Sequence, residues 1–204
     1  MFDARLRQLI DPPLNAAGRW LARRGVTATM VTMAGLGIGL AAGFAAAHQQ
    51  FALALALVLV NRLADGLDGA VARVRGLTDF GGYLDIVADF AFYVAVPLGF
   101  AFAAPETNAV PGAVLLAAFT LTGISFLAFA VMAAKRGAET TAHGRKSFFY
   151  NTGLAEGTET ILAFAAMCLW PQHFAAIAWG YSALCGATVV QRTFAARATF
   201  GGDT

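Results

Sequence analysis

Six long apolar stretches constrain the fold of this chain more than any other feature of its sequence. They cover about residues 27–47, 51–73, 80–104, 111–134, 148–169 and 174–191, and short polar joints separate them. A helix of ~20 mostly apolar residues is long enough to cross the hydrocarbon core of a bilayer. Hydrophobic residues make up 58% of the chain and charged residues only 13%, which is unlike a soluble domain. The sequence therefore predicts an all-α integral membrane protein with six transmembrane helices.

The fourteen lysines and arginines are distributed unevenly between the two ends of these stretches. They lie before the first stretch, around the joint between the second and third, between the fourth and fifth, and after the sixth. The alternate joints, at residues 48–50, 105–108 and 171–173, contain none. Because lysine and arginine resist translocation, we expect both termini in the cytoplasm. The predicted location is the plasma (inner) membrane, with the acidic residues described below on the cytoplasmic side.

The first 24 residues differ from the rest of the chain. They alternate large apolar side chains with five arginines, a pattern that favours an amphipathic helix lying in the headgroup region. No charged-then-apolar leader with a cleavage site is present at the start, so we expect no removed signal peptide. We predict an amphipathic juxtamembrane segment at 1–24, a six-helix transmembrane catalytic domain at 25–195 and a short cytoplasmic tail at 196–204.

Four of the aspartates between residues 65 and 89 of this apolar sequence recur in pairs, three or four residues apart. Residues three or four apart share a helix face, so Asp65 and Asp68 form one stripe, and Asp85 and Asp89 form another. Gly76 lies between them and allows the chain to turn, so two antiparallel helices would bring the four carboxylates together. Like charges near a bilayer need neutralisation, and oxygen ligands suit magnesium, calcium or manganese. We therefore predict a pair of divalent ions, which would in turn bind a diphosphate.

The order Asp-x2-Asp-Gly-x2-Ala-Arg-x7-Gly-x3-Asp-x3-Asp across residues 65–89 resembles the signature of the CDP-alcohol phosphotransferases. This resemblance implies transfer of a phosphoalcohol group from a CDP-alcohol to an acceptor hydroxyl, with release of CMP. It also implies a homodimer with two Mg²⁺ ions, or Mn²⁺ in their place, and Asp89 as the general base. The metal ligands carried over are Asp65, Asp68, Asp85 and Asp89. The nucleotide-binding residues carried over are Asp65, Gly69, Ala72, Arg73 and Gly81.

A lipid donor would explain why such an enzyme resides in a membrane. We expect CDP-diacylglycerol, whose tails can stay in the bilayer while its headgroup reaches the metals, and a small polar alcohol as acceptor. Relatives that use glycerol phosphate often carry a basic residue after the last signature aspartate, and this chain has Phe90 there. This difference weakens glycerol phosphate as the acceptor without excluding it, and inositol phosphate, serine, another amino alcohol and a lipid acceptor stay open. No nucleic-acid partner is expected.

Charged residues beyond the signature are candidates for binding the acceptor or an anionic lipid. Cations gather between the fourth and fifth stretches, where they can hold a phosphate or simply mark the cytoplasmic side. Two acids fall inside the fifth stretch, where an acid is a candidate functional residue; they would contact the acceptor or pair with a cation. These residues are Lys135, Arg136, Arg145, Lys146, Glu156 and Glu159. Arg62, one turn before Asp65, is expected to pair with an acid or a lipid headgroup.

Features of the first stretch concern packing and the site. Thr29 and Thr32 either face the active site or bond the carbonyls of their own helix, and Gly35 and Gly39 form a pair that lets helices approach closely.

The two cysteines, Cys168 and Cys185, lack the spacing of a zinc site or redox pair, which predicts free thiols.

Two other function classes compete with this interpretation. Polyprenyl-diphosphate transferases also bind magnesium and diphosphate through aspartates on membrane helices, but they usually need two acidic motifs. A transporter or a structural membrane protein could use intramembrane acids for ions or for packing, yet neither needs the glycines, alanine and arginine at these spacings.

Overall fold

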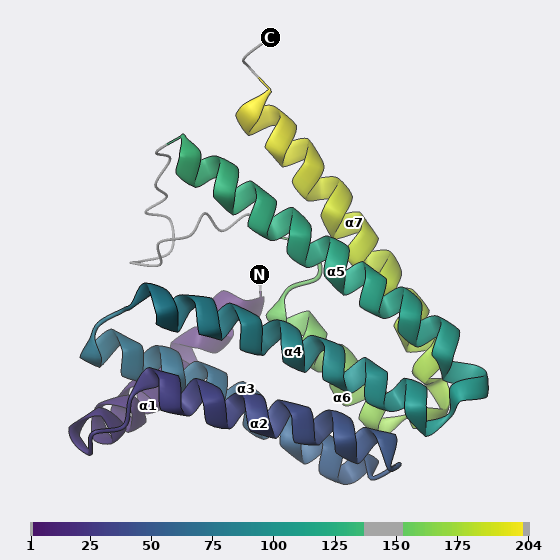
Figure 1. The fold of residues 1–204 in the computed structure, drawn as a ribbon, viewed down its shortest axis with the longest axis horizontal. Helices are drawn as coiled ribbons and strands as arrows, with labels where there is room; N and C mark the ends of the chain where they lie inside the picture. Colours follow the sequence, from purple (N-terminus) through teal and green to yellow (C-terminus); the bar gives the residue numbers. More distant parts are fainter. Residues whose placement is uncertain (1, 137–152, 202–204) are drawn as a thin grey trace.

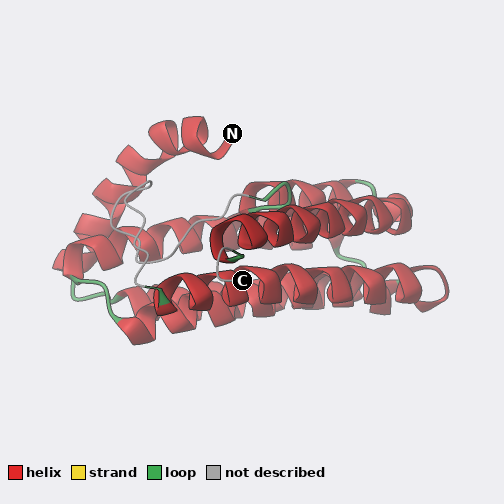
Figure 2. Ribbon diagram, turned by 90° about the horizontal axis from the view of Figure 1, so that it is seen from above, coloured by secondary structure: helices red, strands yellow, loops and turns green. Residues whose placement is uncertain are grey.

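The computed structural model describes residues 2–136 and 153–201, with residues 2–10 described by their backbone only, and these ranges contain helices and no strands (Figure 2). The helices are α1 (Phe2–Arg23), α2 (Ala28–Ala47), α3 (Phe51–Arg75), α4 (Asp79–Ala103), α5 (Pro105–Lys135), α6 (Gly157–Leu169) and α7 (Phe174–Phe200). A short 3₁₀ helix at Pro171–His173 joins α6 to α7. The all-α prediction is therefore confirmed for the described part of the chain.

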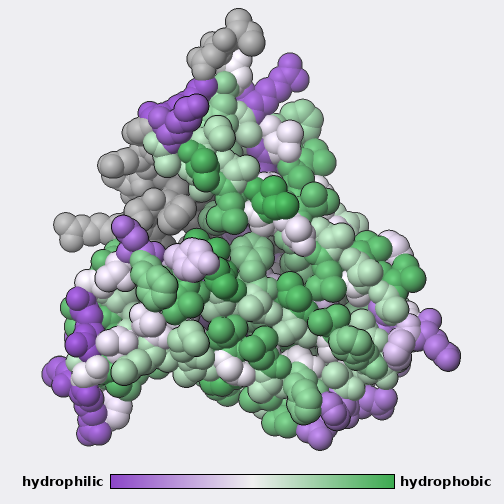
Figure 3. All heavy atoms as spheres, viewed as in Figure 1, coloured by the Kyte–Doolittle hydropathy of each residue, from purple (hydrophilic) through white to green (hydrophobic). Residues whose placement is uncertain are grey.

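Among the described residues, four helical segments are long and apolar enough to cross a membrane: α2, α4, α5 and the segment Pro171–Phe200, which contains α7. Helix α3 has 25 residues, but five charged side chains from Arg62 to Arg75 lower its hydropathy. Helix α6 has only 13 residues. On the face drawn in Figure 3, hydrophobic side chains cover the middle of the molecule and hydrophilic ones gather toward its extremities. A bilayer environment suits this surface, while the number of six spans stays a prediction.

Helix α2 lies at the centre of the half of the molecule that carries the signature. It packs against both α3 and α4, which make few backbone contacts with each other. A Cβ atom on Gly39 would lie 3.0 Å from Asn61 Nδ2 on α3 and 3.0 Å from Phe92 Cδ2 on α4. One on Gly43 would lie 2.7 Å from the carbonyl carbon of Ala95 on α4. These glycines permit the close approach, so the predicted packing role is confirmed for Gly39.

The turn between α3 and α4 forms where the sequence predicts it. Gly76 has a φ of 105°, a left-handed conformation that glycine adopts without steric cost. Thr78 then begins α4 by accepting a hydrogen bond from the backbone N–H of Gly81, at 3.1 Å, as N-cap threonines do. The chain thus reverses direction between the two acidic stripes.

One predicted joint is wrong. Residues 105–108 belong to the first turn of α5, and only Ala104 separates α4 from α5. Proline at the first position of a helix costs no hydrogen bond, since the N–H it lacks would have had no partner there. Pro105 therefore begins a helix at a place where the polar residues predicted a loop.

Aromatic side chains hold the remaining helices against α4. Phe92 on α4 packs edge-on against Phe164 on α6, with ring centroids 5.4 Å apart, and Phe100 stacks on Phe174 of α7 at 4.9 Å. Helices α5 and α7 pack on each other. In Figure 1 they diverge from α2, α3 and α4 toward the end of the molecule where α1 lies. This core fixes the part of α4 that follows the signature aspartates.

Candidate metal centre

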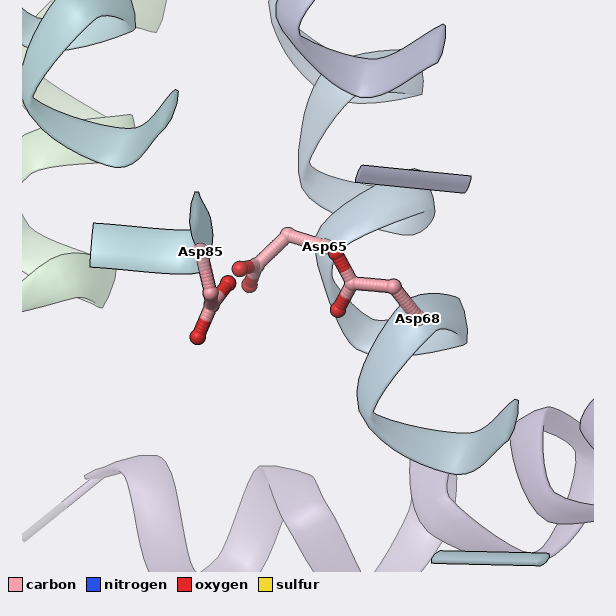
Figure 4. Close-up of side chains that lie close together, drawn as sticks. All are labelled: Asp65, Asp68 and Asp85. Atoms are coloured by element: carbon pink, nitrogen blue, oxygen red, sulfur yellow. The ribbon is translucent and has the colours of Figure 1, made fainter. Parts of the chain in front are cut away.

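Three signature aspartates converge between α3 and α4. Asp65 and Asp68 extend from α3, and Asp85 extends from α4, with their carboxylates directed toward one another (Figure 4). One oxygen from each carboxylate lies within 4.8 Å of the others. A divalent ion with bonds of about 2.0–2.6 Å can contact oxygens up to about 5 Å apart. The predicted convergence of the two stripes is confirmed, and the cluster is able to hold a metal ion.

The fourth aspartate borders the same site. Asp89 lies one turn after Asp85 on α4, and both line a recess of about 10 Å³ together with Asp65 and Asp68. This volume is about the space of one water molecule or small ion. Asp89 is not one of the three residues whose oxygens approach within 4.8 Å, so it is adjacent to the cluster rather than inside it.

Thr32 on α2 orients one of the carboxylates. Its hydroxyl donates to Asp68 Oδ2 at 2.7 Å and also lies 3.0 Å from the carbonyl oxygen of Ala28. A hydroxyl has one proton to donate, and a carboxylate accepts more strongly than a carbonyl oxygen. The sequence left both roles of this threonine open, and the structure records both contacts. Since Thr32 and Asp68 are buried, this bond fixes the direction of the carboxylate.

Arg62 lies beside the cluster, one turn before Asp65 on α3. It forms an ion pair with Asp65, so the expectation that it pairs with an acid is confirmed. The guanidinium also approaches the start of α6: a Cβ atom on Gly157 would lie 3.7 Å from Arg62 Nη2 and 3.9 Å from the Tyr93 hydroxyl. Arg62 therefore lies between the acidic site and the N-terminal end of α6.

Of the proposed nucleotide-binding residues, Gly69, Ala72 and Arg73 follow the signature aspartates on α3, and Gly81 precedes those on α4. Arg73 is exposed and donates to Asn15 Oδ1 on α1 at 2.9 Å. A Cβ atom on Gly69 would meet only Arg73 Nη1, at 3.5 Å, so the backbone of α3 is accessible there. A Cβ atom on Gly81 would lie 2.9 Å from Thr78 Oγ1, and this glycine thus also permits the N-terminal cap of α4.

Helix α1 packs on α3 next to these residues, through small side chains. A Cβ atom on Gly66 would lie 2.8 Å from Leu14 Cδ1, and one on Gly18 would lie 2.7 Å from the Ala70 Cβ. Together with the bond from Arg73 to Asn15, these contacts fix α1 along the signature helix. Ala72 lies on the same helix and is partly buried.

Two of the cations proposed for the acceptor, Lys135 and Arg136, lie at the C-terminal end of α5. Lys135 is exposed in the last turn of α5, and Arg136 donates to the carbonyl oxygens of Thr199 and Phe200 at the end of α7. Arg145 and Lys146 lie outside the described residues.

The prediction that both glutamates lie inside the fifth helix is wrong for Glu156. Helix α6 begins only at Gly157, so Glu156 precedes it and Glu159 lies in its first turn. In the segment before the helix, backbone N–H groups donate hydrogen bonds to side-chain oxygens. Gly153 N–H donates to Glu156 Oε1 at 2.8 Å, and Ala155 N–H donates to Thr188 Oγ1 at 2.9 Å.

Arg192 is a buried cation that the sequence analysis assigned to the region after the sixth helix. The structure places it inside α7, where only 8% of it is exposed. Its Nη1 donates to the carbonyl oxygen of Thr122 on α5 at 2.9 Å, and it lines a cavity of about 210 Å³ between α5 and α7. The sequence contains no glycine or proline from Arg192 to Phe200, and this absence could have predicted that the last helix continues through Arg192. A buried charge in a membrane protein is a candidate functional residue.

Comparison with known sequences identifies relatives over most of the chain. A model of the CDP-alcohol phosphatidyltransferase family matches residues 25–191. Inner membrane protein YnjF of Escherichia coli is 48% identical over 194 residues, which cover 95% of this chain and 94% of that protein. Archaetidylinositol phosphate synthase of Pyrococcus horikoshii is 36% identical over 87 residues, which cover 42% of this chain and 46% of that protein.

Solved structures of Mycobacterium tuberculosis phosphatidylinositol phosphate synthase have the same fold. The structure with CDP-DAG bound has a TM-score of 0.68 at 20% identity, covering 89% of this chain and 92% of that one. The complex with manganese and citrate has a TM-score of 0.66 at 23% identity, covering 89% and 87%. At these identities the likeness concerns the fold.

Proposed function

Because this chain belongs to the CDP-alcohol phosphatidyltransferase family, we propose that it transfers a phosphatidyl group from CDP-diacylglycerol to the hydroxyl of a small polar alcohol. The observation that carries this proposal is the convergence of Asp65, Asp68 and Asp85 between α3 and α4, with Asp89 beside them. A protein of the same fold was solved with CDP-DAG bound, which supports this donor.

The aspartates fit a divalent ion, since they present only oxygen ligands and a formal charge of about −4 before any ion binds. We propose two Mg²⁺ ions held by Asp65, Asp68, Asp85 and Asp89, with Mn²⁺ able to replace them, as the manganese complex of the Mycobacterium protein suggests. When bound, such ions polarise the diphosphate and stabilise the charge that develops on the leaving group. Thr32 supports this arrangement by holding Asp68 in one orientation.

The proposed reaction assigns a separate task to Asp89. The acceptor oxygen attacks the β-phosphorus while Asp89 removes its proton, and the bond from the β-phosphorus to the CMP oxygen breaks, so that CMP leaves with that electron pair. Asp89 suits a general base because it borders the recess without belonging to the closest group of three carboxylates. Arg73, exposed on α3, offers a fork of donors for the nucleotide phosphate, next to the accessible backbone at Gly69.

A phosphate-bearing alcohol, with inositol phosphate first, is the acceptor that we propose. Arg192 supports it as a buried cation beside a cavity, and two similar synthases are named for products that contain inositol phosphate. Gly153 lies against the Arg192 guanidinium and Gly157 against that of Arg62. Four residues of chain span at most about 14 Å, so the buried cation lies within reach of the region beside the aspartates.

The setting of the reaction follows from the same observations. We propose six membrane spans, with the apolar half of α3 and helix α6 added to the four apolar segments, and an active site that faces the cytoplasm. The name of the Escherichia coli relative supports the inner membrane. The homodimer stays a prediction, and cross-linking in lipid that yields only monomer would contradict it.

The test of the proposed reaction is CMP release by the purified protein in lipid bilayers. CDP-diacylglycerol and Mg²⁺ are supplied with inositol phosphate, glycerol phosphate, inositol, serine, ethanolamine or choline. We expect CMP with one acceptor, inositol phosphate first, and none from the Asp89→Asn variant. Diphosphate release with a prenyl substrate would favour a polyprenyl transferase. A protein that neither releases CMP nor binds CDP-diacylglycerol would overturn the proposal and favour transport or a structural role.

A further inference from the structure

The position of Arg62 gives the acidic cluster a positive charge of its own. Its guanidinium pairs with Asp65 from one turn away on the same helix, and it lies within electrostatic range of Asp89 on α4. Its side chain is 37% exposed and that of Asp65 is 22% exposed, so water screens this pair only in part. An arginine cannot lose its charge in a protein.

The same carboxylate is one of the three whose oxygens lie close enough to share a divalent ion. Arg62 donates to Asp65 Oδ2, so an ion that binds this oxygen competes with the guanidinium for its lone pairs. In addition, the fixed charge of Arg62 repels a divalent ion in the cluster. Both effects lower the affinity of the site for metal, and the attraction of Arg62 for Asp65 stabilises the carboxylates when no ion is bound.

We propose that Arg62 is an internal counter-ion that holds Asp65 in the metal-free protein and sets the affinity of the aspartate cluster for divalent ions. This inference rests on the proposed function of the cluster as a metal site. Arg62 is thus a positioning residue, because it acts through Asp65 rather than on the substrate. The start of α6 lies nearby, since a Cβ atom on Gly157 would be 3.7 Å from Arg62 Nη2.

The variant Arg62→Gln tests this role, and Arg75→Gln is its matched control. Arg75 lies on the same helix and carries the same charge, but it donates to the carbonyl oxygen of Val26. Each protein is purified with Mg²⁺ in lipid nanodiscs and stripped by a chelator. It is then titrated with Mn²⁺ while electron paramagnetic resonance measures the free ion. Thermal unfolding in chelator gives the stability of the metal-free state.

We expect Arg62→Gln to bind Mn²⁺ about tenfold more tightly than the natural protein. A unit charge about 6 Å from a divalent ion changes its binding by about this factor even at the dielectric constant of water. The same variant is expected to unfold at a lower temperature in chelator, because four carboxylates lose their counter-ion, and to regain stability with Mn²⁺. Arg75→Gln and the charge-conserving Arg62→Lys are expected to stay within about threefold of the natural affinity.

Two results would overturn the inference in distinguishable ways. Equal or weaker Mn²⁺ binding by Arg62→Gln, with normal binding by the natural protein, removes the role of Arg62 and leaves the metal site intact. Absence of Mn²⁺ binding by the natural protein removes the metal site and the counter-ion role together. Arg62→Gln could prove to fold only with metal present. Its unfolding during a titration with chelator is then the predicted loss of stability, and the inference requires that Arg62→Lys stays folded in the same titration.

Discussion

Replacement of Thr32 by valine tests the support of the acidic cluster by α2. Valine has nearly the shape of threonine, so the change removes the hydroxyl that donates to Asp68 Oδ2 at 2.7 Å without opening a cavity. A hydrogen bond to a charged group contributes about 1.5–3 kcal/mol. Thr32 and Asp68 are each only 7% exposed, so water cannot readily replace the lost donor. We expect the free energy of unfolding in chelator to fall by about 1.5–3 kcal/mol.

The same variant is expected to bind metal less tightly. Partners that orient a ligating side chain typically contribute 10- to 100-fold to metal affinity or activity, and Thr32 orients Asp68. Mn²⁺ titration in nanodiscs measures this change, and Thr120→Val is the control, because the exposed Thr120 hydroxyl donates only to the carbonyl oxygen of Leu116 in its own helix. Natural Mn²⁺ affinity and natural stability in Thr32→Val would refute the reasoning, and would mean that the hydroxyl serves the Ala28 carbonyl alone.

Three further substitutions test other parts of the account. Asp89→Asn is expected to abolish CMP release while the variant still binds CDP-diacylglycerol, because asparagine keeps a side-chain oxygen for a metal ion but cannot take up the proton; near-normal turnover would remove Asp89 from the role of base. Asn15→Ala is expected to raise the KM for CDP-diacylglycerol several-fold with little change in kcat, because Arg73 loses its partner on α1; an unchanged KM would separate α1 from the nucleotide site. Gly43→Leu is expected to cost 3 kcal/mol or more, about the cost of severe overpacking, because its side chain would meet the Ala95 backbone; natural thermal stability would contradict that packing.

The acidic site could be predicted from the sequence because it depends on local rules. Helix periodicity places Asp65 with Asp68 and Asp85 with Asp89, and Gly76 marks the turn that brings the two pairs together. These relations involve residues near one another in the chain, so spacing and residue type were sufficient. The packing role of Gly39 was predictable for the same reason, since small residues one turn apart indicate a close helix contact.

Other features depend on partners distant in the sequence. Arg192 ends an apolar stretch when the sequence is considered alone, but its burial depends on Thr122 and Ser125 of α5, which accept its hydrogen bonds. The late start of α6 at Gly157 depends likewise on Thr188 of α7, which accepts the Ala155 N–H. No periodicity in either segment indicates these partners. The sequence predicted that Arg62 pairs with an acid or a lipid headgroup, and an ion pair with Asp65 is observed. Its position near the start of α6 could be seen only in the tertiary structure.

The most direct test of the central claim is the position of metal and donor in the protein itself. Crystals grown in lipid with Mn²⁺ and CDP-diacylglycerol would locate the ions by anomalous scattering. We expect two Mn²⁺ ions bound by Asp65, Asp68, Asp85 and Asp89, with the diphosphate of the donor against them. Donor density elsewhere in the protein, or the absence of Mn²⁺ at these four carboxylates, would contradict the central claim.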